Sequence, residues 1–170
     1  DLAVCATGIW FHATLGQIPI KYIVKHWVNN PSVGVKEGDS FFFFFPFYCG
    51  VHGGDMGLAV PVFYKGKLIC FTGAVVHSGE NGSTEPGGTP MSARSRYDEG
   101  LLVPPMKIGE DYSIREDVLN MFAHMVRDPR TLILDIKARL AACRISQRRI
   151  LDFVEKKGVS FFIGALRNIL

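Results

Sequence analysis

The stretch GVHGGDMGLAVPVFYKGKLICFTGAVVH, residues 50–77, decides the fold of this chain. Two apolar runs, residues 58–64 and 67–76, stand on either side of the dipeptide Lys65-Gly66. Since glycine readily adopts the positive φ that a two-residue hairpin turn requires, this pattern predicts an antiparallel β-hairpin. In a regular hairpin with this turn, the numbers of two opposed residues add up to 131, as those of Lys65 and Gly66 do.

The open end of this hairpin gathers three residues that can bind a metal. In the regular register His77 lies opposite Gly54, between His52 and Asp55, and opposed Cα atoms are about 4.5–5.5 Å apart. Two neutral imidazoles and a carboxylate suit a divalent metal such as Mn, Fe or Zn, and three protein ligands leave positions open for water or substrate. The alternative is that the histidines are hydrogen-bonded structural residues, because the HxxD pattern is common and a one-residue slip would turn His77 to the other face.

The residues that follow the hairpin offer further acidic candidates. Glu80 is placed to supply an extra ligand or a general base, and Glu85, before a Pro-Gly-Gly turn, is placed to do likewise. For both, the alternative is a solvated loop acid without a chemical role. Both belong to residues 78–111, which the sequence predicts to be a long irregular stretch. The remaining histidines have no other possible metal ligand nearby in the predicted hairpin and are interpreted as structural: His12, His26 and His124.

The region before the hairpin predicts one helix and one strand. Residues 20–28 space their apolar side chains like a helix, with Pro19 as a helix starter. Residues 41–45 are five consecutive phenylalanines, which predict a short buried strand that stops at Pro46. Together with the hairpin, this strand predicts a sheet in the N-terminal half.

From residue 114 onward the pattern becomes helical. Residues 114–126 predict one helix, and Asp128 is expected to cap a second, which has Pro129 at its first position and ends at Gly158. The expected apolar seam of the second helix is Ile133, Ile136, Leu140, Cys143, Ile150 and Val154, with Gln147 as a polar gap. The basic residues Lys137, Arg144 and Arg148 share another face, which we interpret as solvated rather than as a contact with a partner or an anion.

These elements predict an α+β protein with a hairpin-containing sheet followed by long helices. We divide it into a β-rich metal-site region with an N-terminal helix (residues 1–110), a helical region (111–158) and the start of a further segment (159–170). The chain begins without methionine and ends on the apolar FFIGALRNIL. We therefore expect it to be a fragment of a larger multidomain subunit.

Composition and missing motifs exclude several classes of function. The formal net charge of +3 is too small to indicate binding to nucleic acid, and no run of about 18 uncharged apolar residues predicts a membrane span. The four cysteines lack CxxC spacing and no secretory signal is present, which favours reduced thiols in a cytoplasmic protein. Neither GxGxxG nor GK[ST] occurs, so this chain is not expected to bind ATP by either motif.

Four segments in order resemble the hydantoinase B family. They are GDSFFFFFPFYCGVHGGDMGLAVPVFYKGKLICFTGAVVH, EPGG, EGLLVPPMKIGE and RDPRTLILDIKARLAACRISQRRILDFVEKKG. This family includes the B-type subunits of N-methylhydantoinases and 5-oxoprolinases and the large metal-binding subunits of acetone and acetophenone carboxylases. The resemblance runs from about residue 12 to residue 158, and family members are several times longer than this chain.

The resemblance implies a metal site and ATP-dependent chemistry. It implies that His52, Asp55 and His77 bind a divalent metal, with manganese in first place and zinc or iron as alternatives. It also implies a hydantoinase A-type partner that binds ATP, and a small third subunit. Because HSGENGSTEPGG is more similar to the ketone carboxylases, we expect a metal-binding subunit of an ATP-dependent carboxylase that converts acetone or a related ketone, with bicarbonate, to a β-keto acid.

Two alternatives to this function remain. The first is an ATP-dependent cyclic-amide hydrolase, in which the same site activates water on a hydantoin or oxoproline ring. The second is a non-catalytic assembly subunit whose histidines are structural. The chain also departs from the family at Phe44 and Phe45, where members commonly carry Asn-Asp before the proline, and a missing acid there would alter the groups that orient the metal ligands.

Overall fold

The computed structural model describes residues 16–44, 46–48 and 52–169. All strand pairs are antiparallel, and the five strands form one sheet in the order β3-β2-β1-β4-β5. The strands are β1 (Ser40–Phe44), β2 (Asp55–Tyr64), β3 (Lys67–His77), β4 (Val103–Glu110) and β5 (Ser113–Ile114). The helices are α2 (Gln17–His26), the 3-10 helix η1 (Pro46–Tyr48), α3 (Glu116–Ala123), α4 (Pro129–Lys157) and α5 (Val159–Ile169). Cys5, His12, Phe45 and Cys49 lie outside the described residues.

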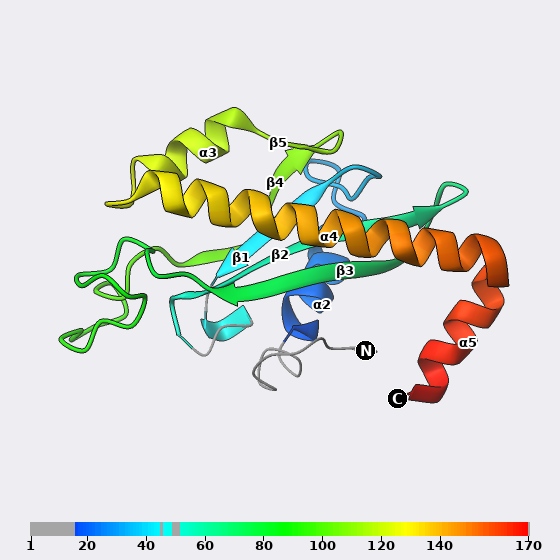
Figure 1. The fold of residues 1–170 in the computed structure, drawn as a ribbon, viewed down its shortest axis with the longest axis horizontal. Coiled ribbons are helices and arrows are strands. Elements are labelled where there is room, and N and C mark those ends of the chain that lie inside the picture. Colours follow the sequence, from blue (N-terminus) through cyan, green and yellow to red (C-terminus); the bar gives the residue numbers. More distant parts are fainter. Residues whose placement is uncertain (1–15, 45, 49–51, 170) are drawn as a thin grey trace.

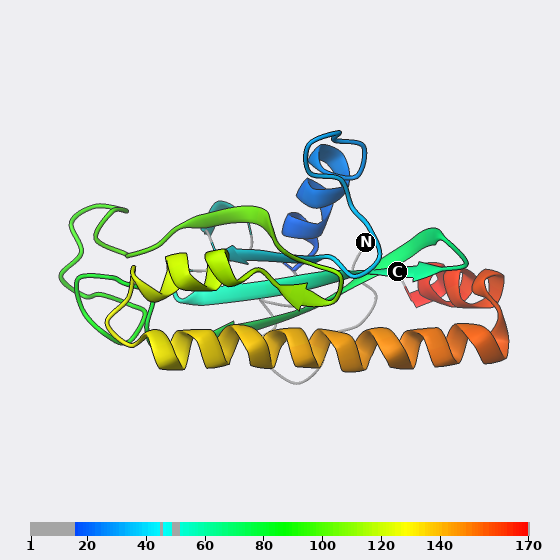
Figure 2. The same ribbon diagram turned by 90° about the horizontal axis from the view of Figure 1, so that it is seen from above.

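Helices lie on both sides of the sheet. The long helix α4 runs along one face, and α2 lies on the opposite side (Figure 1, Figure 2). On the α4 face, Met56 and Leu58 of β2 belong to the same buried cluster as Ile136 of α4. On the α2 face, Phe43 and Ala59 pack with Ile20. The predicted α+β class, with a sheet first and long helices after it, is confirmed.

The phenylalanine run forms the central strand β1, between β2 and β4. Its four described phenylalanines are each at most 2% exposed. Phe42 and Phe44 belong to the cluster on the α4 face, whereas Phe43 belongs to the cluster on the α2 face. A strand that is buried on both faces needs apolar side chains at consecutive positions, which explains the unbroken run. The predicted buried strand is therefore confirmed up to Phe44.

The hairpin is present, but its register differs from the predicted one. Lys65 and Gly66 both have positive φ, of 50° and 75°, as a two-residue hairpin turn requires. Next to the turn, opposed residues have numbers that add up to 131, but Val62 lies opposite Cys70, so Ile69 is an extra residue in a β-bulge. Beyond the bulge the numbers add up to 132.

The bulge corrects one prediction and explains why two of the predicted metal residues meet. Asp55, and not Gly54, lies directly opposite His77. Opposed residues of an antiparallel pair point to the same face, so the bulge places the Asp55 and His77 side chains on one face of the sheet. In the regular register these two side chains would have pointed to opposite faces.

The predicted irregular stretch of residues 78–111 is wrong at its C-terminal end. Its last part forms β4, which pairs with β1 on the side away from β2. The strand was not predicted because it contains Pro104 and Pro105, and proline is rare inside sheets. These prolines are accommodated because β5 pairs only with Gly109 and Glu110, so no described strand lies beside them on that side, and because the register of β1 and β4 shifts at this point, between Phe42 and Phe44.

Helix α4 begins and ends as predicted. The Asp128 side chain accepts a hydrogen bond from the Thr131 backbone N–H at 3.1 Å, and Gly158, with a φ of 85°, follows the last turn. Its buried residues are Leu132, Ile136, Arg139, Cys143, Gln147 and Val154. The seam is thus rotated toward Leu132 compared with the predicted one, and it includes a buried arginine. The other helices differ in extent from their predictions, since α2 begins earlier and α3 is shorter.

The predicted solvated basic face of α4 is wrong at one position. Lys137 and Arg148 are exposed, but Arg144 is half-buried. Its guanidinium donates a hydrogen bond to the Gly38 carbonyl at 2.8 Å and lies 4.6 Å from the centre of the Tyr112 ring. Arg144 therefore contacts the loop at Gly38 and the turn at Tyr112 of this chain. Among the described helices, none combines the length and apolar character needed to cross a membrane.

Candidate metal centre

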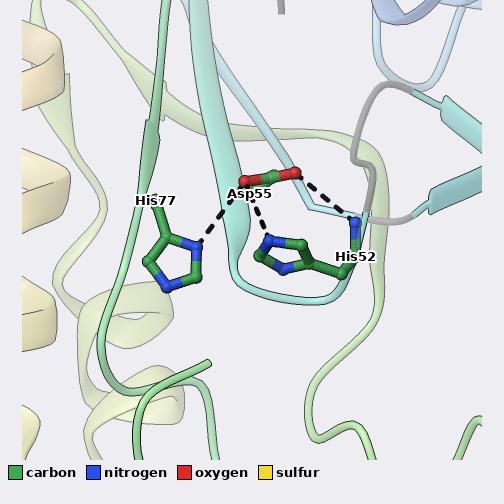
Figure 3. A group of neighbouring side chains, drawn as sticks. All are labelled: His52, Asp55 and His77. Atoms are coloured by element: carbon green, nitrogen blue, oxygen red, sulfur yellow. Dashed lines mark hydrogen bonds and ion pairs between the residues drawn. The ribbon is translucent and has the colours of Figure 1, made fainter. Parts of the chain in front are cut away.

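Three side chains meet at the open end of the β2–β3 hairpin (Figure 3). Asp55 is the first residue of β2 and His77 is the last residue of β3. His52 lies in the tight turn just before β2, in which the Asp55 N–H donates to the His52 carbonyl at 3.2 Å. The His52 N–H in turn donates to Asp55 Oδ2 at 3.4 Å. The turn and the strand pairing thus bring both imidazoles to one carboxylate.

The separations of these three groups fit a metal ion. His52 Nε2 and His77 Nδ1 each lie 3.7 Å from Asp55 Oδ1, and the three possible ligand atoms all lie within 4.8 Å of one another. Ligands about 2.1 Å from a shared ion are at most about 4.2 Å apart. Both distances to Asp55 satisfy this limit, and the two imidazoles need to approach by at most about 0.6 Å.

The His77 ring is held in an orientation that suits a ligand. Its Nε2 lies 3.1 Å from the Gly87 carbonyl oxygen. If Nε2 carries the proton and donates it to that carbonyl, the lone pair of Nδ1 faces Asp55, and such a contact commonly fixes the tautomer of a metal-binding histidine. Two glycines close around the ring, because a Cβ at Gly54 would lie 2.6 Å from Cε1 and one at Gly88 would lie 3.0 Å from both Cε1 and Nε2.

His52 is held less firmly. Its Nδ1 accepts a hydrogen bond from the Gly54 N–H at 3.2 Å, while Nε2 faces Asp55. Coordination of an ion through Nε2 would place the ring proton on Nδ1 and would release the contact with Gly54. The side chains of His52 and His77 are 33% and 42% exposed, whereas Asp55 is 2% exposed. A buried carboxylate is therefore covered by two imidazoles that solvent can reach.

A small cavity opens beside His52. Its volume is about 230 Å³ and His52 forms part of its wall. The other lining residues are Pro46, Gly53, Gly88, Thr89, Pro90 and Glu99. Pockets for drug-sized ligands are typically about 300–1,000 Å³, so this cavity suits a smaller molecule.

The structure does not place the two predicted loop acids with the metal residues. Glu80 is buried and forms a double ion pair with Arg127, with distances of 3.1 Å and 3.2 Å, and it also accepts a hydrogen bond from the Gly82 N–H. Glu85 accepts hydrogen bonds from the Met91 N–H and the Ser92 hydroxyl, which lower the pKa of its carboxyl group. Both acids thus hold the loop that follows β3. A chemical role for Glu80 stays a prediction.

The two other described histidines make structural contacts, as predicted. The ring of His26 lies against Tyr22 and Trp27, and Nδ1 of His124 lies 2.8 Å from the Asn120 carbonyl.

Residues that support the centre were missed in the sequence. Gly54 and Gly88 were not singled out, although each belongs to a pair of glycines. Gly54 is in the pair that follows His52, and Gly88 is in the pair of the Pro-Gly-Gly turn. Arg139 was not singled out either, yet it is 3% exposed and donates hydrogen bonds to β2 and β3. Its position three residues after Ile136 and four before Cys143, on the apolar seam, is the signal that would have identified it.

Comparisons with known proteins agree with the sequence resemblance. The sequence model of the family described as hydantoinase B/oxoprolinase matches residues 1–170. The acetophenone carboxylase delta subunit of Aromatoleum aromaticum is 37% identical over 171 residues, which cover all of this chain and 24% of that protein.

Two solved structures share the fold. The nucleotide-free structure of acetone carboxylase has a TM-score of 0.90 and 28% identity, and the match covers 96% of this chain and 21% of that one. The ATP-dependent caprolactamase from Pseudomonas jessenii has a TM-score of 0.83 and 27% identity, and the match covers 94% and 27%. The chain thus spans about a quarter of the length of these relatives, as expected for part of a larger subunit.

Proposed function

The chain belongs to the hydantoinase B/oxoprolinase family, and on this premise we propose that it is part of the metal-binding subunit of an ATP-dependent ketone carboxylase. The observation that carries the proposal is the meeting of His52, Asp55 and His77 at the open end of the hairpin. The identity of 37% to an acetophenone carboxylase subunit and the likeness to the acetone carboxylase structure support a carboxylase within this family.

In this proposal three atoms hold a divalent metal: His52 Nε2, Asp55 Oδ1 and His77 Nδ1. The donor set of two imidazoles and one carboxylate suits manganese, which we propose first, and also iron or zinc. Bound there, the ion would supply a Lewis acid that polarises a substrate oxygen. The chain's own groups would prepare the site: Asp55 contributes a buried carboxylate, and the Gly87 carbonyl would accept the proton of His77 on Nε2.

The proposed substrates are a small ketone and bicarbonate. The cavity of about 230 Å³ suits molecules of this size, and it supports this proposal because His52 lines its wall. ATP would be bound by a hydantoinase A-type partner, with a small third subunit completing the complex, because this sequence carries neither nucleotide motif. No nucleic acid partner is proposed. Glu80 remains a candidate base only if its ion pair with Arg127 opens.

A second candidate function is ATP-dependent hydrolysis of a cyclic amide. It is favoured by the TM-score of 0.83 to a caprolactamase. The same three residues would then support attack of water on a lactam or hydantoin ring. Metal content does not distinguish these two reactions, but it distinguishes both from a non-catalytic assembly subunit.

The test uses the complete complex purified with its partner subunits. We expect a divalent transition metal by elemental analysis, and carbon from labelled bicarbonate in an acid product when ATP and acetone or acetophenone are supplied. His77→Ala should lose most of the metal and the activity, whereas His124→Ala, an exposed histidine on the chain segment after α3, should keep both.

Three outcomes would contradict the proposal. Unchanged metal content in His77→Ala would refute the metal site. Hydrolysis of hydantoin, oxoproline or caprolactam without any carboxylation would favour the second candidate. Tight binding of ATP to this subunit without its partners would refute the assignment of ATP to another chain.

A further inference from the structure

Arg139 is a buried cation in the middle of α4. It is 3% exposed, and its guanidinium makes three hydrogen bonds that reach two strands. Nε donates to the Met56 carbonyl of β2 at 3.1 Å, and Nη2 donates to the Val76 carbonyl of β3 at 2.7 Å and to the Ser78 hydroxyl at 3.0 Å. One side chain thus bridges both arms of the hairpin.

The acceptors of Arg139 are the immediate neighbours of two metal residues. Met56 follows Asp55 along β2, and Val76 and Ser78 stand on either side of His77. Met56 and Val76 are directly opposed and form the pair next to Asp55 and His77. Arg139 therefore contacts the hairpin at the position where its register decides whether Asp55 faces His77.

Arg139 approaches from the face opposite to the metal residues. Side chains alternate along a strand, and Met56 points into the cluster that contains Ile136 of α4. The neighbouring side chain of Asp55 accordingly points to the other face. Arg139 supports the two strands from behind, and it leaves the metal side open.

The buried charge of Arg139 is compensated locally. Asp135, one turn earlier on α4, lies 3.8 Å from Nη1 of Arg139 and accepts a hydrogen bond from the Ser78 hydroxyl at 2.7 Å. The Ser78 N–H also donates to the Gly54 carbonyl at 2.8 Å, which extends the hairpin pairing by one step. Ser78 therefore links the end of β3 to α4 and to the residue that packs against the His77 ring.

We propose that Arg139 is a positioning residue of the metal centre, which locks β2 and β3 in the register that sets Asp55 opposite His77. The inference rests on the proposed metal function. A guanidinium is required because its planar fork donates in several fixed directions, whereas a lysine ammonium at this point cannot hold both carbonyls in the same geometry.

The same helix supplies a matched control. Gln147, two turns after Arg139, is also buried and donates to the Pro61 carbonyl of β2 at 2.7 Å. This contact is of the same kind, but it reaches one strand only and lies near the bulge, away from the metal residues. Loss of either residue should lower stability, but only loss of Arg139 should change the metal site.

The experiment measures Co²⁺ binding by the complete, metal-stripped complex, through the visible absorption of the bound ion, together with thermal unfolding. We expect Arg139→Met to raise the Kd for Co²⁺ by about 10-fold or more, as for other residues that orient metal ligands, and to alter the absorption spectrum. Arg139→Lys should not restore either property. Gln147→Met should lower the unfolding temperature but keep the Kd within about twofold of the parent protein.

Further variants make each result decisive. Wild-type affinity and spectrum in Arg139→Met would overturn the inference. If that variant does not fold, Ser78→Ala decides, because it removes one acceptor of Arg139 and must weaken Co²⁺ binding in the same direction. Wild-type affinity in His77→Ala would refute the metal function itself, whereas loss of binding in His77→Ala with full binding in Arg139→Met and Ser78→Ala would refute only the role of Arg139.

Discussion

The substitution Gly54→Ala tests how closely the metal centre is packed. A Cβ at this position would lie 2.6 Å from Cε1 of His77 and 2.8 Å from the Gly88 carbonyl oxygen. The backbone of Gly54 lies outside the left-handed region, so alanine itself is compatible with the local conformation. The effect of the added methyl group should therefore arise from its contacts with the His77 ring and with the Gly88 carbonyl oxygen beside that ring.

The size of the effect follows from these distances. Carbon atoms that are not bonded approach to about 3.5 Å, so the ring and the methyl group must separate by about 0.9 Å. Metal–ligand distances tolerate only about 0.2 Å, so the His77 Nδ1 atom leaves its place in the site. We expect metal affinity to fall by about 10- to 100-fold. Overpacking of this kind should lower the free energy of unfolding by about 1–3 kcal/mol, which leaves the protein folded.

The assay is a metal titration of the complete complex, with circular dichroism and thermal unfolding to verify the fold. Gly79→Ala is the matched control, because it lies two residues after His77 and a Cβ there meets no atom within 4 Å. Parent-like metal affinity in Gly54→Ala, or an equal loss of affinity in Gly79→Ala, would show that packing against the His77 ring does not control metal binding.

Three further predictions follow from buried contacts. Burial raises the pKa of the Cys143 thiol to about 12. At pH 8 we therefore expect Cys143 to be alkylated on the order of 10³-fold more slowly in the folded than in the unfolded protein, and the rate in the folded protein should increase as pH rises toward 12. Peptide mass spectrometry measures both rates. Arg127→Leu should expose the loop after β3 to limited proteolysis more than Glu80→Gln, since both remove the ion pair but only Arg127→Leu also removes the hydrogen bond to the Ser83 carbonyl; a fall in metal content in Glu80→Gln alone would instead identify Glu80 as a ligand. Ile136→Ala should lower the free energy of unfolding by about 2–5 kcal/mol and Leu134→Ala, 64% exposed, by about 0.5 kcal/mol or less; equal losses in denaturant unfolding would contradict the observed seam.

Local rules of sequence account for much of the fold. The Lys65-Gly66 turn, the Asp128 cap and the Gly158 end of α4 were predicted because each depends on a few adjacent residues. The strand β4 was missed because Pro104 and Pro105 argue against a strand, and they are tolerated because no described strand flanks them beyond β4 and the pairing with β1 is irregular there. That information is tertiary and does not stand in the local pattern.

The site was predicted as a group, but its geometry was not. The three predicted metal residues were grouped from the hairpin, yet the predicted partner of His77 was one residue away from the observed one. No glycine or proline stands in β3 at Ile69 itself, but Pro61, next to Val62 on the paired strand β2, is a local sign of irregular pairing that was not used. Arg139 was missed because a basic residue on a helix is usually solvated, and its burial depends on carbonyl groups of two distant strands.

The bulge at Ile69 divides the hairpin into two independently variable parts. From Val62 to Asp55 and from Cys70 to His77 the two arms make the same number of steps, and only this equality brings the carboxylate and the imidazole together. An insertion or deletion of a single residue within one of these arms reverses which side its final residue faces. The tip, by contrast, is free to change in length, and removal of Ile69 itself would straighten β3 without disturbing the far end. In evolution and in engineering, the turn and the residues next to it can therefore be replaced by a turn of another length. The arms tolerate substitutions, but not a change in their number of residues.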